Sequence, residues 1–141
     1  MTLLLLSLLL SASDPAPAPT PALVQPALPE ALPIVAMRSA EKATADLALG
    51  KRAGVWVAAS TPELALAAQG ALLDALRKRG YQPVGIDAAD GAAAEREARE
   101  RGTDLLVRAR VSVEGGELVL AGDRIGTWVN FWDGITLIRQ M

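Results

Sequence analysis

The side chains of this sequence that could carry acid–base chemistry are a few carboxylates and one serine. Asp87 and Asp90 lie in a predicted loop between a strand and a helix, and Asp133 stands beside a group of tryptophans. Paired carboxylates can act as general acid and base, and Ser60 could act as a nucleophile. Each has a structural alternative that we favour. We expect Asp87 or Asp90 to cap the following helix, and Asp133 to begin an Asp-Gly turn. Ser60 is expected to cap the helix that follows it.

The composition excludes several other kinds of site. The chain of 141 residues contains no histidine and no cysteine. A Ser-His-Asp triad, a histidine or thiolate metal site, a cysteine nucleophile and a disulfide are therefore impossible. The formal net charge of −2 disfavours a nucleic-acid partner. We expect no catalytic, cofactor-binding or metal-binding residues, and thus a protein that is not an enzyme.

The aromatic side chains gather near the carboxyl end, in the segment TWVNFW. On a strand, Trp128, Asn130 and Trp132 share one face, while Val129 and Phe131 share the other. Both faces of this strand are therefore apolar. Three interpretations remain open: packing inside the domain, a contact surface for a protein partner or a second copy, and a platform on which sugars stack.

The amino-terminal residues predict export. Residues 1–13 contain a leucine-rich run that is too short to span a bilayer and is followed by small residues. We expect a signal peptide cleaved between Ser13 and Asp14, which gives a periplasmic or secreted protein with no membrane span after cleavage. Residues 14–33 hold seven of the nine prolines. They predict a linker, either a semi-rigid spacer or a docking peptide, before a domain over residues 34–141.

Helical periodicity and turn residues predict the elements of that domain. The leading helix is expected over residues 35–48, with Gly50 as its carboxyl-terminal cap. The next elements are a buried strand around Val55–Val57, a helix from Ser60 to Gly80, an edge strand at 81–87 that contains a proline, and an alanine-rich helix within 89–102.

Residues 103–123 predict a hairpin. Apolar and polar residues alternate, and Gly115-Gly116 forms a two-residue turn. This turn places Val113 opposite Leu118, Val111 opposite Leu120 and Arg108 opposite Asp123. Asp133-Gly134 suggests a second hairpin, and a glycine at position 122 or 126 could carry a bulge.

These elements predict an α/β fold, a two-layer sandwich. A mixed sheet with β-α-β-α-β order continues into antiparallel hairpin strands, and a leading helix precedes it. Because both crossovers should be right-handed, we expect the helices mainly on one face, with both crossover helices on the same side.

Over residues 34–139, the pattern resembles the amino-terminal domain of TolB. The resemblance rests on VWVAAS-TPELALAAQGALLDALRKRGYQPVGID, on an alanine-rich helix, and on RGTDLLVRARVSVEGGELVLAGD. Related modules occur in CsgG-type curli-secretion proteins and in lipoprotein activators of penicillin-binding proteins. TolB continues into a β-propeller, and none follows Met141, so we expect a stand-alone or truncated module. The lipid-attachment cysteine of the lipoprotein members is also absent here.

The resemblance implies a non-catalytic protein-interaction module of the bacterial envelope, without cofactors. Its partner would be an envelope protein or a second copy of the chain, bound through Trp128, Asn130 and Trp132. The alternative is a domain that binds glycan or peptidoglycan, with Trp128 and Trp132 as stacking platforms.

Overall fold

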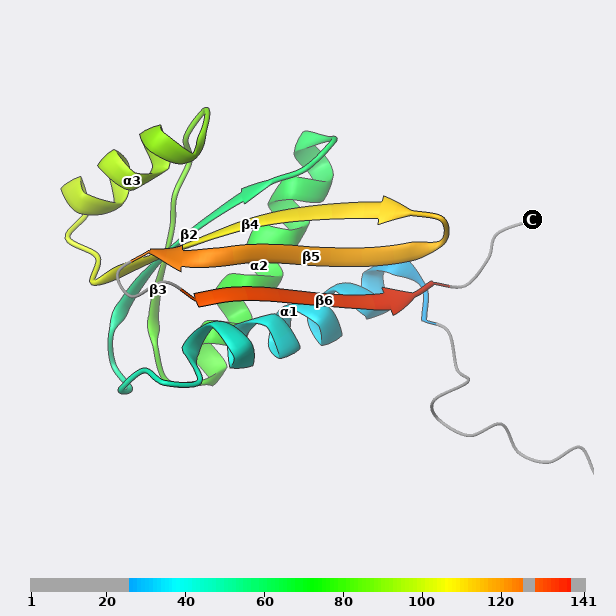
Figure 1. Cartoon of the computed structure of the whole chain (residues 1–141), viewed down its shortest axis with the longest axis horizontal. Coiled ribbons are helices and arrows are strands. Elements are labelled where there is room, and N and C mark those ends of the chain that lie inside the picture. Colours follow the sequence, from blue (N-terminus) through cyan, green and yellow to red (C-terminus); the bar gives the residue numbers. More distant parts are fainter. Residues whose placement is uncertain (1–25, 126–128, 138–141) are drawn as a thin grey trace, which may run out of the picture.

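The computed structural model describes residues 26–125 and 129–137, which form one sheet with three helices (Figure 1). The helices are α1 (Leu28–Thr44), α2 (Pro62–Lys78) and α3 (Gly91–Glu100). The strands are β2 (Arg52–Ala58), β3 (Gln82–Gly85), β4 (Leu105–Glu114), β5 (Glu117–Ile125) and β6 (Val129–Thr136). The strand order is β3-β2-β4-β5-β6. The first three strands are parallel and the last three antiparallel, so the predicted mixed α/β sheet is confirmed.

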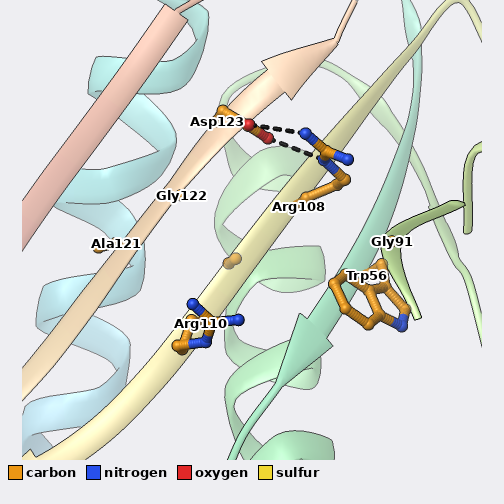
Figure 2. A pocket seen from close by; sticks show the side chains of 8 residues that line it. Trp56, Gly91, Arg108, Arg110, Ala121, Gly122 and Asp123 are labelled. Carbon is orange, nitrogen blue, oxygen red and sulfur yellow. Dashed lines mark hydrogen bonds and ion pairs between the residues drawn. The ribbon is translucent and has the colours of Figure 1, made fainter. Parts of the chain in front are cut away.

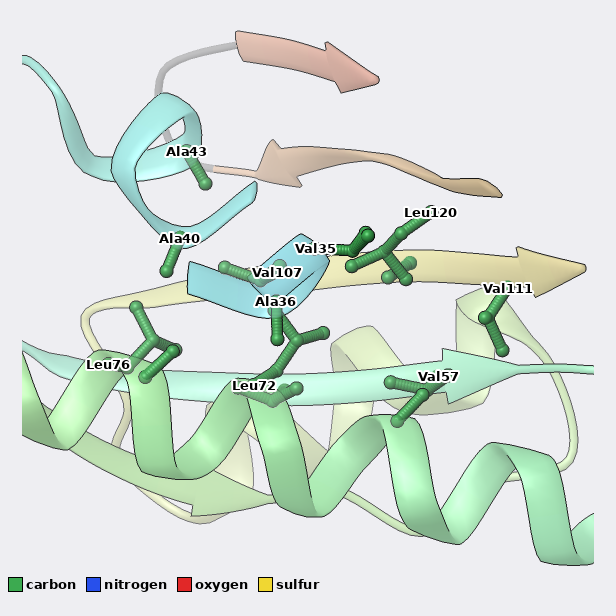
Figure 3. Packing of buried hydrophobic residues seen from close by; sticks show 14 of the residues in the cluster. Val35, Ala36, Ala40, Ala43, Val57, Leu72, Leu76, Val107, Val111 and Leu120 are labelled. Atoms are coloured by element: carbon green, nitrogen blue, oxygen red, sulfur yellow. The ribbon is translucent and has the colours of Figure 1, made fainter. Parts of the chain in front are cut away.

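The main core lies between the sheet and the pair α1 and α2. Small residues of α1 and leucines of α2 pack on valines and leucines of β2, β4 and β5 (Figure 3). On β4, this face carries the odd-numbered residues from Leu105 to Val111, all of which are buried. Alternation along the strands therefore fixes which face each helix covers.

The third helix lies on the other face, which corrects our expectation that both crossover helices share one side. A Cβ built on Gly54 would lie 3.5 Å from Ala98 of α3 and 3.3 Å from Leu106. The chain crosses from β2 outward to β3, then returns past β2 to β4. Two right-handed crossovers in opposite directions place their helices on opposite faces. Figure 1 shows α3 apart from α1 and α2.

The first helix begins seven residues earlier than predicted, so residues 28–33 of the expected linker are helical. Pro29 occupies the first turn, where its missing N–H costs no hydrogen bond, and Pro33 lies inside the helix. Ala31 and Val35 are buried on either side of Pro33, and this burial offsets the lost bond. Helix α1 ends at Thr44, so Gly50 is not its cap but a loop residue with φ of 85°.

The predicted β4–β5 register is confirmed at all three pairs. Gly115 and Gly116 have φ values of 58° and 77°, as a two-residue turn with two positive φ angles requires. Pairing of β5 with both neighbours is continuous through Gly122, so this glycine carries no bulge. Gly126 lies outside the described residues.

The expected second hairpin is wrong, because β6 runs straight through Asp133 and Gly134. Asp133 pairs with Leu120 and its side chain points to α1. Each of the two residues instead serves one face of the sheet. Asp133 places its carboxylate on the face that packs against α1. Gly134 has no side chain and so leaves space on the opposite face for Trp132 and Glu117.

Candidate functional site

The candidate site is the sheet face opposite α1 and α2, which we call the open face. It consists of the even-numbered residues of β4 and β6 and the odd-numbered residues of β5. Helix α3 covers this side over β2, β3 and the ends of β4 and β5 where Leu106 pairs with Ile125. Over the rest of β4, β5 and β6, none of the described helices lies on the open face (Figure 1).

A bidentate ion pair marks the border of the open face with α3. Arg108 donates to Asp123 through Nε at 3.0 Å and Nη2 at 2.8 Å (Figure 2). Glu95 of α3 lies 3.5 Å from the remaining terminal nitrogen. The hydrogen bond with Asp123 raises the pKa of Arg108 above its ordinary value. This guanidinium is neutralised and has a structural role.

The next cation along β4 is different. Arg110 is exposed and stands between Ala58 on β2 and Ala121 on β5. Among the described residues, it makes no hydrogen bond or ion pair. Together with Trp56, Arg108 and other residues it lines a hollow of about 320 Å³ (Figure 2). Arg110 therefore offers an uncompensated positive charge next to small, apolar neighbours.

Trp56 borders the same hollow from β2. Its Nε1 donates to the backbone oxygen of Ala88 at 3.0 Å, and the ring is half-buried against the α3 side. The indole N–H is thus used within the domain. The sequence indicated Trp56 as part of a buried strand and gave no sign of its place beside Arg110.

Among the described residues, Trp132 is the largest exposed apolar group on the open face. It lies opposite Ala121 and is 57% exposed. A Cβ built on Gly134 would lie 3.2 Å from the Trp132 ring and 2.9 Å from a carboxylate oxygen of Glu117. The ring and this carboxylate therefore converge over the same glycine.

The predicted contact residues are partly placed by the structure. Asn130 and Trp132 share the open face and are both exposed, whereas Phe131 is buried in the core. Trp128 lies outside the described residues, as do Ser13 and Asp14 of the expected cleavage site. The alternation predicted for TWVNFW is thus present over residues 129–132.

The candidates for chemistry have structural roles or stand alone. Asp90 caps α3 by accepting from the Ala93 N–H at 2.8 Å, as predicted, whereas Asp87 is exposed. The cap of α2 is Thr61, which accepts from the Leu64 N–H, so the prediction that Ser60 caps this helix is wrong. Within residues 26–125 and 129–137, no three acidic side chains gather as a metal site would require.

Asp133 lies beneath the sheet, on the core side. Its carboxylate is 3.2 Å from Lys42 Nζ and 3.3 Å from Arg38 Nε, although the Arg38 nitrogen is not aligned for a hydrogen bond. Lys42 also donates to the Trp132 carbonyl at 2.7 Å. These contacts tie α1 to the strand that presents Trp132. The sequence did not reveal them, because the partners lie about 90 residues apart.

A second link between α1 and the sheet is made by Arg124, whose side chain is fully buried. It donates to the Ala43 carbonyl at 2.8 Å and to Asp46 at 2.7 Å. The hydrogen bond from Arg124 holds the pKa of Asp46 below its ordinary value. Arg124 thus satisfies a carbonyl at the end of α1 and sets the helix against β5.

Comparison with known proteins shows the fold and nothing finer. No family model and no curated protein matches the sequence. Among solved structures, the LpoB C-terminal domain from Salmonella enterica is similar, with 14% identity, a TM-score of 0.60, and coverage of 74% of this chain and 98% of that domain. The same domain from Escherichia coli has 12% identity and a TM-score of 0.57, covering 77% and 98%. The NMR structure of E. coli LpoB has 14% identity and a TM-score of 0.55, covering 96% and 84%.

These similarities refine the resemblance seen in the sequence. The matching structures are LpoB domains from two bacteria. They share the fold of this chain, and none of them is a TolB or CsgG domain.

Proposed function

We propose that this chain is a non-catalytic protein-interaction module of the bacterial cell envelope. It binds a protein, either another envelope protein or a second copy, through the open face around Asn130 and Trp132. The proposal includes no catalytic residue, metal or cofactor. It is supported by the shared LpoB fold and by the resemblance to a group that includes lipoprotein activators of penicillin-binding proteins.

The observation that carries the proposal is the exposed Trp132 on a broad sheet face. Exposed apolar side chains indicate a contact site when they form one contiguous patch. Here Val119 and Ala121 adjoin the indole on the neighbouring strand. Tryptophan and arginine are the residues that most often dominate binding energy at interfaces, and Arg110 lies next to Ala121 on the far side.

The proposed location is periplasmic or secreted, after cleavage of residues 1–13. In the part of the chain that the structure describes, no helix is long and apolar enough to cross a membrane. Residues 14–27 then connect the new amino terminus to α1, in place of the longer linker expected from the prolines. A semi-rigid spacer of this kind would hold the domain away from its point of attachment or release.

Site-specific photo-crosslinking in living cells tests the proposal. A photoreactive amino acid replaces Asn130 on the open face or, as the control, Lys78 on the exposed side of α2. We expect covalent adducts from position 130, and we expect Trp132→Ser in the same chain to reduce them at least several-fold. Circular dichroism should confirm that the Trp132→Ser protein stays folded, because the ring is mostly exposed.

The absence of any adduct at position 130, or equal adducts at both positions, would overturn the proposal. In that case, titration of the wild-type protein with soluble peptidoglycan fragments tests the glycan alternative through tryptophan fluorescence.

A further inference from the structure

The open face carries unpaired charges of both signs at separate places. Arg110 lies in the middle of β4, opposite Ala121, and Glu114 lies opposite Glu117 beside the turn. Among the described residues none of the three makes an ion pair, whereas Arg108 on the same strand is fully paired. Two carboxylates directly across a strand pair repel each other. Within residues 26–125 and 129–137, the acidic end of this face therefore has no paired cation, and its centre has no paired anion.

We infer that the occupant of the open face is a second copy of this chain, bound face to face about a twofold axis. This inference rests on the proposed function, and it names the partner. The axis runs across the strands through the row of Ser112 and Val119. It exchanges position 110 of one copy with position 114 of the other.

The geometry follows from the spacing along β4. Arg110 and Glu114 are four residues apart and so point to the same face, about 13 Å from each other. The axis through the midpoint places each Arg110 opposite Glu114 of the second copy, with that copy's Glu117 beside it. The same contact is thus made twice, as in every isologous dimer. An axis along β5 would instead place Arg110 over Trp132 of the second copy.

The shape of the face permits this packing. Helix α3 stands over Gly54 and Leu106, at the end of the face away from the turn. The axis places the α3 helices of the two copies at opposite ends of the interface, where neither obstructs the other. Val119 lies between the charged rows, Trp132 lies in the row of Arg110 two strands away, and both would be buried there. Two sheets that pack in this way lie about 10 Å apart.

Charge reversal tests the inference with the protein itself as the probe. The full chain is recovered from the envelope fraction, and sedimentation equilibrium gives its dimer dissociation constant. We expect Arg110→Glu and Glu114→Arg each to weaken the dimer roughly tenfold or more, because each creates two like-charge contacts. The double variant, R110E with E114R, should recover most of the affinity. Lys78→Glu on α2 makes the same charge change away from the open face and should leave the dimer unchanged.

The inference is overturned by a wild-type protein that stays monomeric at every concentration, or by a double variant that dimerises no more tightly than the single ones. Circular dichroism excludes unfolding as the cause. These failures are distinct from failure of the proposed function. An adduct at position 130 with a protein other than this chain would keep the interaction surface and reject the second copy.

Discussion

Among single residues, the buried Asp133 carboxylate joins the last strand to the first helix. Replacing Asp133 by alanine leaves Arg38 and Lys42 without their acid. Both cations are half exposed, so we expect a loss of about 1–2 kcal/mol of unfolding free energy rather than the larger cost of a fully buried pair. Urea denaturation measures this loss. Asp74→Ala removes only exposed ion pairs on α2 and should cost close to nothing. Equal losses at the two positions would contradict this role for Asp133.

Gly122 on β5 lies directly against the backbone of β4. A Cβ at this position would overlap the carbonyl oxygen of Arg108 and lie 2.9 Å from Ala109 Cα. Backbone in the middle of a sheet cannot move aside, so Gly122→Ala should cost about 2–4 kcal/mol. Gly70 on α2 has no atom within 4 Å of its would-be Cβ, and Gly70→Ala should stabilise by roughly 0.5–1 kcal/mol. Thermal unfolding compares the two variants, and a Gly122→Ala protein as stable as wild type would refute the close approach.

Among the elements, the β4–β5 hairpin depends on its turn. Valine is strained at the positive φ angles of Gly115 and Gly116. Replacing both by valine should therefore lower the unfolding free energy by roughly 1–3 kcal/mol. Gly115→Asn is the matched control, because asparagine tolerates this conformation. Melting curves distinguish the variants, and an unchanged midpoint for the valine pair would show that the turn does not constrain the hairpin.

The link between Arg124 and Asp46 makes the docking of α1 sensitive to acid. The folded-state pKa of Asp46 is lowered by the hydrogen bond from Arg124. Its contribution to stability is therefore present above the ordinary value of 3.8 and is lost as the pH falls through the lower folded value. We expect Asp46→Asn to lose less stability than wild type on acidification from neutral pH to below 3.8. Urea midpoints across this range measure the difference, and parallel curves would exclude the effect.

The hairpin could be predicted because its determinants are local. Alternation and the glycine pair lie within one short segment, and together they fix the register. The face occupied by α3 could not be predicted in this way, because it depends on the order of strands across the sheet. The Asp-Gly sequence predicts a turn at Asp133, because the partners that hold this residue in a strand, Arg38 and Lys42, are distant in sequence.

On the open face, too, some features follow from local sequence and others from the pairing of distant strands. Its alternation placed Asn130 and Trp132 together, but the part played by Arg110 depends on which neighbours the sheet gives it. Ala58 on β2 lies beside Arg110 only after the parallel strands have paired.

For the whole molecule, we predict export and cleavage. The intact mass of protein from the periplasm or the medium should correspond to a chain that begins at Asp14. Small residues are required before the cut, so Ser13→Phe should leave a longer, uncleaved product. A wild-type protein that retains Met1 in the cytoplasm would reject this prediction.

The packing of α1 against β6 affects how the domain folds while it is being synthesised. Lys42 and Asp133 are 91 residues apart, and a ribosome adding about 5–20 residues per second needs roughly 5 to 20 seconds to make the interval between them. During that interval, α1 cannot pack against β6, because β6 has not yet been synthesised. An apolar flank that is left unburied for so long is a target for chaperones and a route to aggregation. The contact between the first helix and the last strand is therefore among the last that synthesis of the domain permits.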